Sequence, residues 1–116
     1  MRCKRGEIVL VLFPDSNLRT PKRRPALIVQ ADNLNTGLNQ TIVAMISSNI
    51  SRANHPARMR LVLNSTEGRQ AGILMDSVVM ADNLATIREI EIDRRLGVLN
   101  EMKVVDTSIR HTLALS

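Results

Sequence analysis

The sequence predicts a mainly β domain, a small and mostly antiparallel sheet of about five to seven strands, curled or closed, with a C-terminal α-helix packed against it. Short runs rich in Val, Ile and Leu recur along the first three quarters of the chain and end at Pro, Gly, Asn, Asp or Ser. In the last quarter the apolar residues recur every three to four positions, which is the spacing of one helical face. With 116 residues and 44% apolar composition, the chain can build one core and is too short for two domains, so we expect a single domain over residues 1–116.

The strands are expected wherever an apolar run is bounded by turn residues. Residues 8–13 form a continuous β-branched run that predicts a strand buried on both faces. Residues 59–63 alternate as a half-exposed strand would. Further strands are expected at residues 26–30, 41–46, 73–80 and 85–87, with loops at 16–24 and 32–40, a turn at 51–56, a turn-rich connection at 64–72 and a bend at 81–84.

The last quarter is expected to be helical. Ile92, Leu96 and Leu99 are spaced for one face of a helix, and Asn100 is the expected N-cap of the final helix. The apolar stripe expected to face the sheet consists of Met102, Val105, Ile109 and Leu113.

Composition and charge exclude some functions and favour others. Phe13 is the only aromatic residue, so the chain cannot bind single-stranded nucleic acid by stacking bases on aromatic rings. The formal net charge of +5 favours a polyanionic partner, either nucleic acid or an acidic protein segment. No apolar run is long enough for a membrane span or a signal peptide, and the lone Cys3 fits the reducing cytosol, so a cytoplasmic location is expected.

Residues 21–30 contain the first candidate for chemistry. Lys22, Arg23 and Arg24 lead directly into an apolar run. Pro25 restricts the preceding residue to extended backbone and lacks an N–H, so it suits the first position of a strand. Arg24 is therefore expected at a loop-to-strand corner, where its planar guanidinium could bind two phosphate oxygens. The alternative is a basic loop that only keeps the protein soluble.

The sequence contains no pattern typical of a metal site or of a catalytic triad. His55 and His111 are far apart, and Cys3 stands alone, so no metal cofactor is expected and the histidines are interpreted as surface or partly packed residues. The five glycines stand singly, which excludes a Gly-rich phosphate loop, and nothing local supports a Ser, His and Asp triad.

What remains is phosphate chemistry carried by cations and hydroxyls. Besides Arg24, the candidates are Ser47 at the end of the third strand and Asp82 in a turn between late strands. Neighbouring strand ends in a small sheet can bring such residues together. The alternative for Ser47, Ser48 and Asn49 is that they cap a turn.

Several segments, taken in order, carry a resemblance to a known family. Residues 6–9, residues 23–29, residues 42–47 with their terminal Ser, residues 76–87 with their acidic residue, and the final helix at 101–115 resemble the MazF/PemK family of toxin endoribonucleases. The similarity spans nearly the whole chain. It implies a compact, partly open SH3-like barrel of the CcdB/Kid/MazF type that forms a homodimer.

The resemblance also implies an activity and its residues. Members cleave single-stranded RNA at short sequences without a metal, and a cognate antitoxin places an acidic, flexible segment in the RNA groove. By position, Arg24 corresponds to the family's catalytic Arg, Ser47 to its Thr or Ser, and Asp82 to an acidic residue that some members use as a base. The remaining candidates for RNA binding are Arg19, Lys22, Arg23, Ser48 and Asn49.

Three departures from the family pattern stand out. Residues 17–22 replace a Gly, Ser, Glu and Gln loop that many members carry before the Arg. Met80 stands where some members have a second catalytic Arg, and Ala85 stands where they have another basic residue. The expected mechanism therefore depends mainly on Arg24 and Ser47.

In that mechanism the ribose 2′-hydroxyl attacks the adjacent phosphorus and expels the next 5′-oxygen. Arg24 would stabilise charge on the phosphorane oxygens, and Ser47 would hold a nonbridging oxygen. Asp82 is the one candidate base, and it would need a raised pKa. The expected dimer would bury apolar edge residues near Met75 and Met80.

Two alternative functions are kept. One is a protein inhibitor of the gyrase-poisoning type on the same barrel, whose members act through aromatic and small residues at the extreme C-terminus. This chain ends in Leu113, Ala114, Leu115 and Ser116, without an aromatic residue. The other is a non-catalytic module that binds RNA or an antitoxin.

Overall fold

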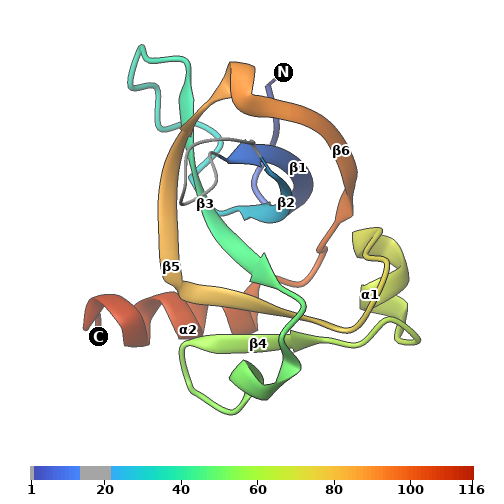
Figure 1. The fold of residues 1–116 in the computed structure, drawn as a ribbon. Coiled ribbons are helices and arrows are strands. Elements are labelled where there is room, and N and C mark those ends of the chain that lie inside the picture. The colour runs from blue at the N-terminus through green and yellow to red at the C-terminus, as the bar shows by residue number, and fades with distance from the viewer. Residues whose placement is uncertain (1, 14–21) are drawn as a thin grey trace.

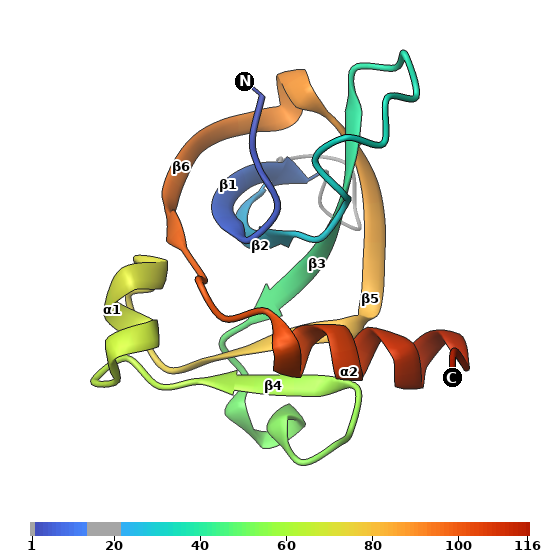
Figure 2. The same cartoon turned by 180° about the vertical axis from the view of Figure 1, so that it is seen from behind.

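The structure is a computed structural model that describes residues 2–13 and 22–116. The described residues form one antiparallel sheet with two α-helices and two 3-10 turns (Figures 1 and 2). In chain order the elements are β1 (Glu7–Phe13), β2 (Lys22–Ile28), β3 (Gln40–Ser47), η1 (Ile50–Ala53), β4 (Arg58–Leu61), α1 (Thr66–Ala71), β5 (Ser77–Arg88), η2 (Glu89–Glu91), β6 (Ile92–Val98) and α2 (Lys103–Leu113).

The six strands are hydrogen-bonded in the order β4-β5-β3-β2-β1-β6, and each pair is antiparallel. The sheet curls so that β5 and β6 run along opposite sides while β1 and β2 lie inside the curl (Figure 1). Its two end strands, β4 and β6, do not pair with each other, so the described sheet is an open barrel. This confirms the predicted class.

Two apolar clusters explain why the central strands are hydrophobic at consecutive positions. Ile8 and Leu27 belong to the cluster beneath α2, together with Val105 of that helix. Their neighbours Val9 and Ala26 face the opposite way, into a second cluster inside the curl. Because both faces of β1 and β2 are covered, alternation between apolar and polar residues is lost there. The prediction of a first strand buried on both faces therefore holds for Ile8, Val9 and Val11, whereas Leu10 is half-buried and Leu12 is 39% exposed.

Helix α2 lies across one end of the curled sheet, beside β4 (Figure 2). Val105 is fully buried, and Met102 and Ile109 pack on the same cluster. The predicted stripe is therefore correct for these three residues, whereas Leu113 is 52% exposed. The helix begins at Lys103, so its N-cap is Met102 and the predicted cap at Asn100 is wrong; the Asn100 side chain donates a hydrogen bond to Gln70 Oε1 at 3.1 Å.

No helix in the described part of the chain is long and apolar enough to cross a membrane.

The segment around Ile92 is a strand, so the predicted helical face is wrong. β6 pairs with β1 through two register shifts, one at Ile8/Val9 and one at Leu10/Val11. Each irregularity changes which residues face inward, and the inward apolar residues consequently recur at irregular intervals. This pattern imitates the helical spacing of Ile92, Leu96 and Leu99.

The predicted turn-rich connection at 64–72 contains the short helix α1. Ser65 caps it, since its Oγ accepts from Gly68 N at 3.0 Å, and Gly72 ends it in the left-handed conformation at φ 72°. Ser65 and Gly72 can be recognised in the sequence as helix-start and helix-end residues. Gly68 lies between them and has a low helix propensity, so the local sequence favours a turn.

β5 joins the two late strands that the sequence predicts separately. Leu84 pairs with Ala44 while Met80 pairs with the next residue, Met45, so residues 81–83 form an irregular insertion in the strand. The predicted bend at 81–84 corresponds to this bulge. Residues 73–76, predicted as strand, precede β5 and connect it to α1.

Arg24 lies inside β2 and not at its first position, which corrects the predicted corner. It pairs with Val11 of β1, and Pro25 pairs with Leu10. Pairing between β2 and β3 begins only at Ala26. Pro25 is tolerated within the strand because that half of β2 has no β3 partner to which an N–H would have to donate.

Candidate functional site

Arg24 and Ser47 are brought to one cavity of about 300 Å³, here called the inner cavity. Arg24 reaches it from β2, and Ser47 reaches it from the end of β3. The cavity opens where the two strands are no longer paired, since their register contacts stop at Ala26 and Met45. The predicted meeting of these two residues at neighbouring strand ends is therefore what the structure shows.

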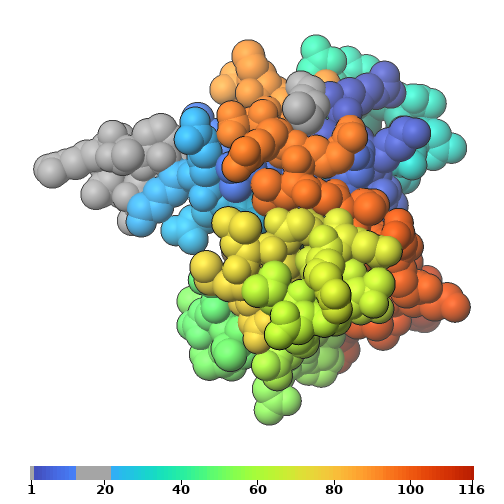
Figure 3. All heavy atoms as spheres, turned by 90° about the vertical axis from the view of Figure 1, so that its right-hand side faces the viewer, coloured from blue at the N-terminus to red at the C-terminus, as the bar shows by residue number. Residues whose placement is uncertain are grey.

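A larger basic cavity of about 750 Å³ adjoins the inner one and shares Arg24, Ile46, Ser47 and Arg52 with it. Its cations are Lys22, Arg23, Arg24, Arg52 and Arg94, and its apolar lining includes Leu10, Ile73, Leu74, Met75 and Leu96. In Figure 3 the light-blue atoms of early β2, the yellow atoms following α1 and the green atoms near η1 approach one another at the left side of the molecule.

No Asp or Glu is among the described residues that line either cavity. Five cations around an apolar wall, without a carboxylate, produce a positive potential that attracts polyanions. Of the predicted RNA-binding residues, Lys22, Arg23, Ser48 and Asn49 line the basic cavity. Arg19 lies outside the described residues.

The hydrogen bonding of Ser47 suits it to donate to an anion. Its Oγ accepts from the backbone N–H of Asn49 at 3.1 Å, and the side chain is half-buried. Since a hydroxyl has one hydrogen to donate, this bond leaves the donor available for a ligand in the cavity. The structure thus shows the turn-capping contact of Ser47, and this contact leaves the hydroxyl hydrogen free for the predicted functional role.

Asp82 is not part of either cavity. Its carboxylate is paired with the Arg58 guanidinium, at 2.8 Å for Nη2 to Oδ2 and 3.4 Å for Nε to Oδ1. The hydrogen bond from Arg58 holds the pKa of Asp82 below its ordinary value. A general base needs the opposite shift, so the geometry and the pKa both disagree with the predicted role.

The two histidines contact each other outside the cavities. Their rings are 6.2 Å apart between centroids in an edge-on arrangement, and both residues are exposed. Among the described residues no three His, Cys, Asp or Glu side chains are grouped closely enough to hold a metal ion.

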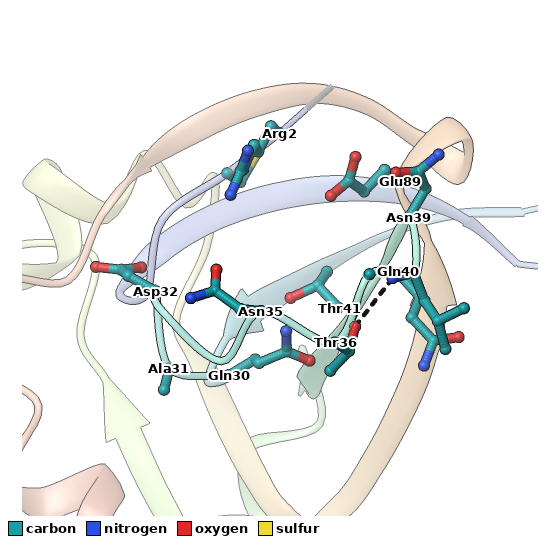
Figure 4. Close-up of a pocket in the computed structure, with 13 residues that line it drawn as sticks. Arg2, Gln30, Ala31, Asp32, Asn35, Thr36, Asn39, Gln40, Thr41 and Glu89 are labelled. Atoms are coloured by element: carbon teal, nitrogen blue, oxygen red, sulfur yellow. Dashed lines mark hydrogen bonds between the residues drawn. The ribbon is translucent and has the colours of Figure 1, made fainter.

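A third cavity, of about 370 Å³, lies at the other end of β3 (Figure 4). Gln40 and Thr41, at the start of that strand, line it together with the loop that precedes them. Its single Arg, Arg2, faces two carboxylates, Asp32 and Glu89. This charge balance does not favour a phosphate, and none of the predicted site residues lies there.

Comparison with known proteins shows the family of the chain. The sequence profile of a family described as "PemK-like, MazF-like toxin of type II toxin-antitoxin system" matches residues 4–113. The chain belongs to this family. It is 31% identical over 107 residues to endoribonuclease MazF6 of Mycobacterium tuberculosis strain H37Rv, covering 90% of each chain. It is 26% identical over 104 residues to endoribonuclease MazF of Staphylococcus epidermidis, covering 89% of this chain and 82% of the relative.

Solved structures of the PemK/MazF family share the fold. The Mycobacterium tuberculosis toxin MazF-mt6 superposes with a TM-score of 0.74 at 20% identity, covering 95% of this chain and 98% of the toxin. A mycobacterial endoribonuclease solved in complex with its cognate antitoxin gives a TM-score of 0.76 at 19% identity, covering 99% and 98% of the two chains.

The two residues that depart from the PemK/MazF pattern lie in the inner cavity. Met80 and Ala85, at the positions where the resemblance implies a basic residue in some members, both line it with apolar side chains. Met80 is 6% exposed, which also corrects the expectation that it lies at an edge to be covered by a dimer. Met75 is 54% exposed and remains available for such a contact.

Sequence reasoning missed three parts of the site. Arg52 belongs to a polar turn and resembles any solvated Arg in the sequence. Arg94 lies on β6, which was predicted as helix. Leu74 is 88% exposed beside the cations. An exposed apolar residue after a helix-ending Gly is a weak signal, and only the fold shows what surrounds it.

Proposed function

We propose that residues 1–116 form one toxin domain, a sequence-specific and metal-independent endoribonuclease that cleaves single-stranded RNA. The observation that carries this proposal is the meeting of Arg24 and Ser47 at a cavity whose charged lining is entirely basic. Membership in the family and the endoribonuclease names of the relatives support it.

The reaction needs little from the protein besides positioning and charge. The 2′-oxygen of the ribose bonds to the adjacent phosphorus, and the bond from phosphorus to the next 5′-oxygen breaks. The 2′-hydroxyl gives up its proton and the leaving oxygen takes one up, so one product ends in a 2′,3′-cyclic phosphate and the other begins with a 5′-hydroxyl. DNA has no 2′-hydroxyl and should remain uncut.

Arg24 and Ser47 have separate roles in this reaction. The guanidinium of Arg24 places fixed donors against the phosphorane oxygens as their charge grows, which lowers the barrier to attack. The Ser47 hydroxyl donates to a nonbridging oxygen and sets the angle of attack. Asp82 is not assigned as the base, because it is paired with Arg58 outside the cavity.

The decisive experiment is incubation of the pure protein with a long RNA transcript in EDTA. We expect cleavage at a limited set of sites, with 5′-hydroxyl products. A protein that leaves the transcript intact but binds it would favour the non-catalytic module. A protein that neither cuts nor binds RNA but inhibits DNA gyrase would favour the protein-inhibitor alternative.

Substitutions of Arg24 and Ser47 test whether these two residues are catalytic. Arg24→Lys keeps the charge but loses the rigid multi-donor group, so single-turnover cleavage should fall about a hundredfold, as for loss of one donor to a developing anion. Ser47→Ala should have a similar effect.

Arg23→Ala is the matched control for Arg24→Lys. Arg23 lines only the larger cavity, and its Nε lies 3.5 Å from Asp93 Oδ2 of β6. Removing it should weaken RNA binding modestly and cleavage in proportion. If Arg24→Lys cuts at nearly the wild-type rate, or Arg23→Ala is the more damaging change, the assignment is wrong.

We also propose a cytoplasmic homodimer that is inhibited by an acidic antitoxin. The mixture of cations with exposed Leu74 and Met75 suits a carboxylate-rich segment that also carries apolar side chains. Such a segment should compete with RNA, and its affinity should fall as salt rises. A complex that still cuts RNA at full rate would refute the shared groove, and a molar mass of 12.9 kDa in light scattering, that of one chain, would refute the dimer.

A further inference from the structure

The turn η1 carries Arg52 to the wall shared by the inner and basic cavities. Asn49 fixes the start of this turn. Its Oδ1 accepts from Ser51 N at 3.2 Å and from Ser51 Oγ at 2.6 Å, and its carbonyl accepts from Arg52 N at 3.1 Å. The backbone N–H of Asn49 in turn donates to Ser47 Oγ. Ser47 and Arg52 thus belong to one hydrogen-bonded unit.

The far end of η1 is held by a second set of contacts. Arg58 of β4 donates from Nη1 to the carbonyl oxygen of Arg52 at 3.2 Å. The other nitrogens of the same guanidinium bind both oxygens of Asp82, which lies in the bulge of β5. The side chains of Arg58 and Asp82 are only 24% and 31% exposed. A bidentate pair of this kind fixes the direction of the guanidinium, and therefore the position of the carbonyl that it binds.

We propose that Arg52 is a second phosphate-binding cation beside Arg24, and that Arg58 and Asp82 are positioning residues that hold η1 so that Arg52 faces the bound strand. The proposal rests on the proposed function and deepens it. It gives Asp82 a positioning role, which fits its ion pair with Arg58 outside the two cavities. It also supplies a second cation to a cavity in which Met80 and Ala85 provide none.

The sign of the charges makes the positioning role testable. Asp82 is an anion near a basic groove, so its removal alone should strengthen the general attraction between protein and RNA. If Asp82 instead acts by holding Arg52 in place, its removal should slow cleavage. Asp82→Ala should therefore lower cleavage even though the net charge of the protein becomes more positive.

The first experiment measures single-turnover cleavage of an RNA oligonucleotide that carries a site mapped on the long transcript. Arg52→Ala should lower the rate at least about tenfold, because a preorganised donor to a developing anion is lost. Arg52→Lys should recover part of that loss. Arg60→Ala is the matched control, since Arg60 is exposed on β4 and lines neither cavity. Its cleavage should stay within about twofold of wild type, and circular dichroism checks the fold of each variant.

The second experiment measures binding to a 2′-O-methyl RNA oligonucleotide, which has no free 2′-hydroxyl, over a range of salt. If Arg52 contacts one phosphate, Arg52→Ala should reduce the slope of log K against log salt by about 0.7. An unchanged slope would show that Arg52 does not contact phosphate. This measurement needs no cleavage, so it tests Arg52 even if the wild-type protein proves inactive and the proposed function fails.

A double-mutant cycle tests the positioning role. If Asp82 acts through Arg52, Asp82→Ala should cost little in a protein that already carries Arg52→Ala. The pH–rate profile of Asp82→Asn should keep the wild-type shape, because a positioning residue is not the group that titrates in the reaction.

Three results, besides an unchanged salt slope, would overturn the proposal. If Arg52→Ala cuts RNA at the wild-type rate while Arg24→Lys is impaired, the proposed function stands and the second cation does not. If Asp82→Ala costs as much with Arg52 as without it, Asp82 does not act through Arg52. If Asp82→Asn removes the acidic limb of the pH–rate profile, Asp82 is a base after all.

Discussion

Gly97 of β6 lies against the backbone of α1, and Gly97→Ala is a direct test of that packing. A Cβ at this position would lie 2.2 Å from Gln70 O, 2.4 Å from Ala71 C and 2.5 Å from Ala71 O. Ordinary carbon contacts begin at about 3.5 Å, so the two backbones would have to separate by about 1 Å. No side-chain rotation can relieve the clash, since all three atoms belong to the main chain of the last turn of α1.

The expected cost follows from this geometry. Overpacking a core usually costs about 1–3 kcal/mol, and a clash between two backbones belongs at the upper end, about 2–3 kcal/mol. In a domain of this size that corresponds to a fall in Tm of roughly 8–12 °C. The assay is thermal and urea unfolding followed by circular dichroism, at one fixed protein concentration because dimerisation would shift the midpoint.

Gly37→Ala is the control for backbone strain. Gly37 has a φ of 78° but nothing within 4 Å of the added Cβ, so its substitution should cost only the strain of the left-handed conformation, about 1 kcal/mol. If Gly97→Ala destabilises the protein no more than Gly37→Ala does, the close approach of α1 and β6 is not as the structure has it.

Three further predictions concern the core and two ionisable groups. Val105→Ala should lower the free energy of unfolding by about 2 kcal/mol in urea titrations, since it removes two buried methyl groups and leaves a small cavity, whereas Val104→Ala, at a 51% exposed position, should change it little. Burial, with the nearby charge of Glu7, raises the pKa of the Cys3 thiol, so mass spectrometry should show slower alkylation by iodoacetamide at pH 8 in the folded protein than in urea. The pKa of Asp82 is lower in the folded state, so its stabilisation is present above about pH 4 and is lost as the pH falls through the folded value. Asp82→Asn should therefore reduce the fall in Tm between pH 5 and pH 3, and an unchanged fall would contradict the ion pair.

The pairing of Arg24 with Ser47 could be predicted because both positions carry local signals. A Pro directly follows the arginine, and the serine ends an apolar run. Arg52 carries no such signal. Its position depends on contacts between Arg58 and Asp82, which are 24 residues apart and meet only because β4 pairs with β5 beside a bulge. The charge of Arg52 is visible in the sequence, but the contacts of β4 and β5 that fix its direction are not.

The errors in the predicted fold have a common physical origin. Ile92, Leu96 and Leu99 have helical spacing because two irregularities in the β1–β6 pairing disturb the alternation of a regular strand. The predicted separation of two strands at residues 81–84 is wrong because a bulge bends β5 without ending it. In both places tertiary pairing decides the structure, and local periodicity does not contain that information.

The short pairing between β2 and β3 divides the sheet into two hydrogen-bonded halves. Only Ala26, Leu27 and Ile28 of β2 pair with β3, so Arg24 belongs to the half built from β6, β1 and β2, while Ser47 belongs to the half built from β3, β5 and β4. Val29 N and Gln30 N also donate to the carbonyl oxygen of Ile42, so the two walls of the groove are joined by a short run of hydrogen bonds at residues 26–30 and by the packing of α1 against Gly97 of β6. We expect amide hydrogens at residues 26–28 to exchange faster in the free protein than those of β1, and to slow when RNA draws the two halves together.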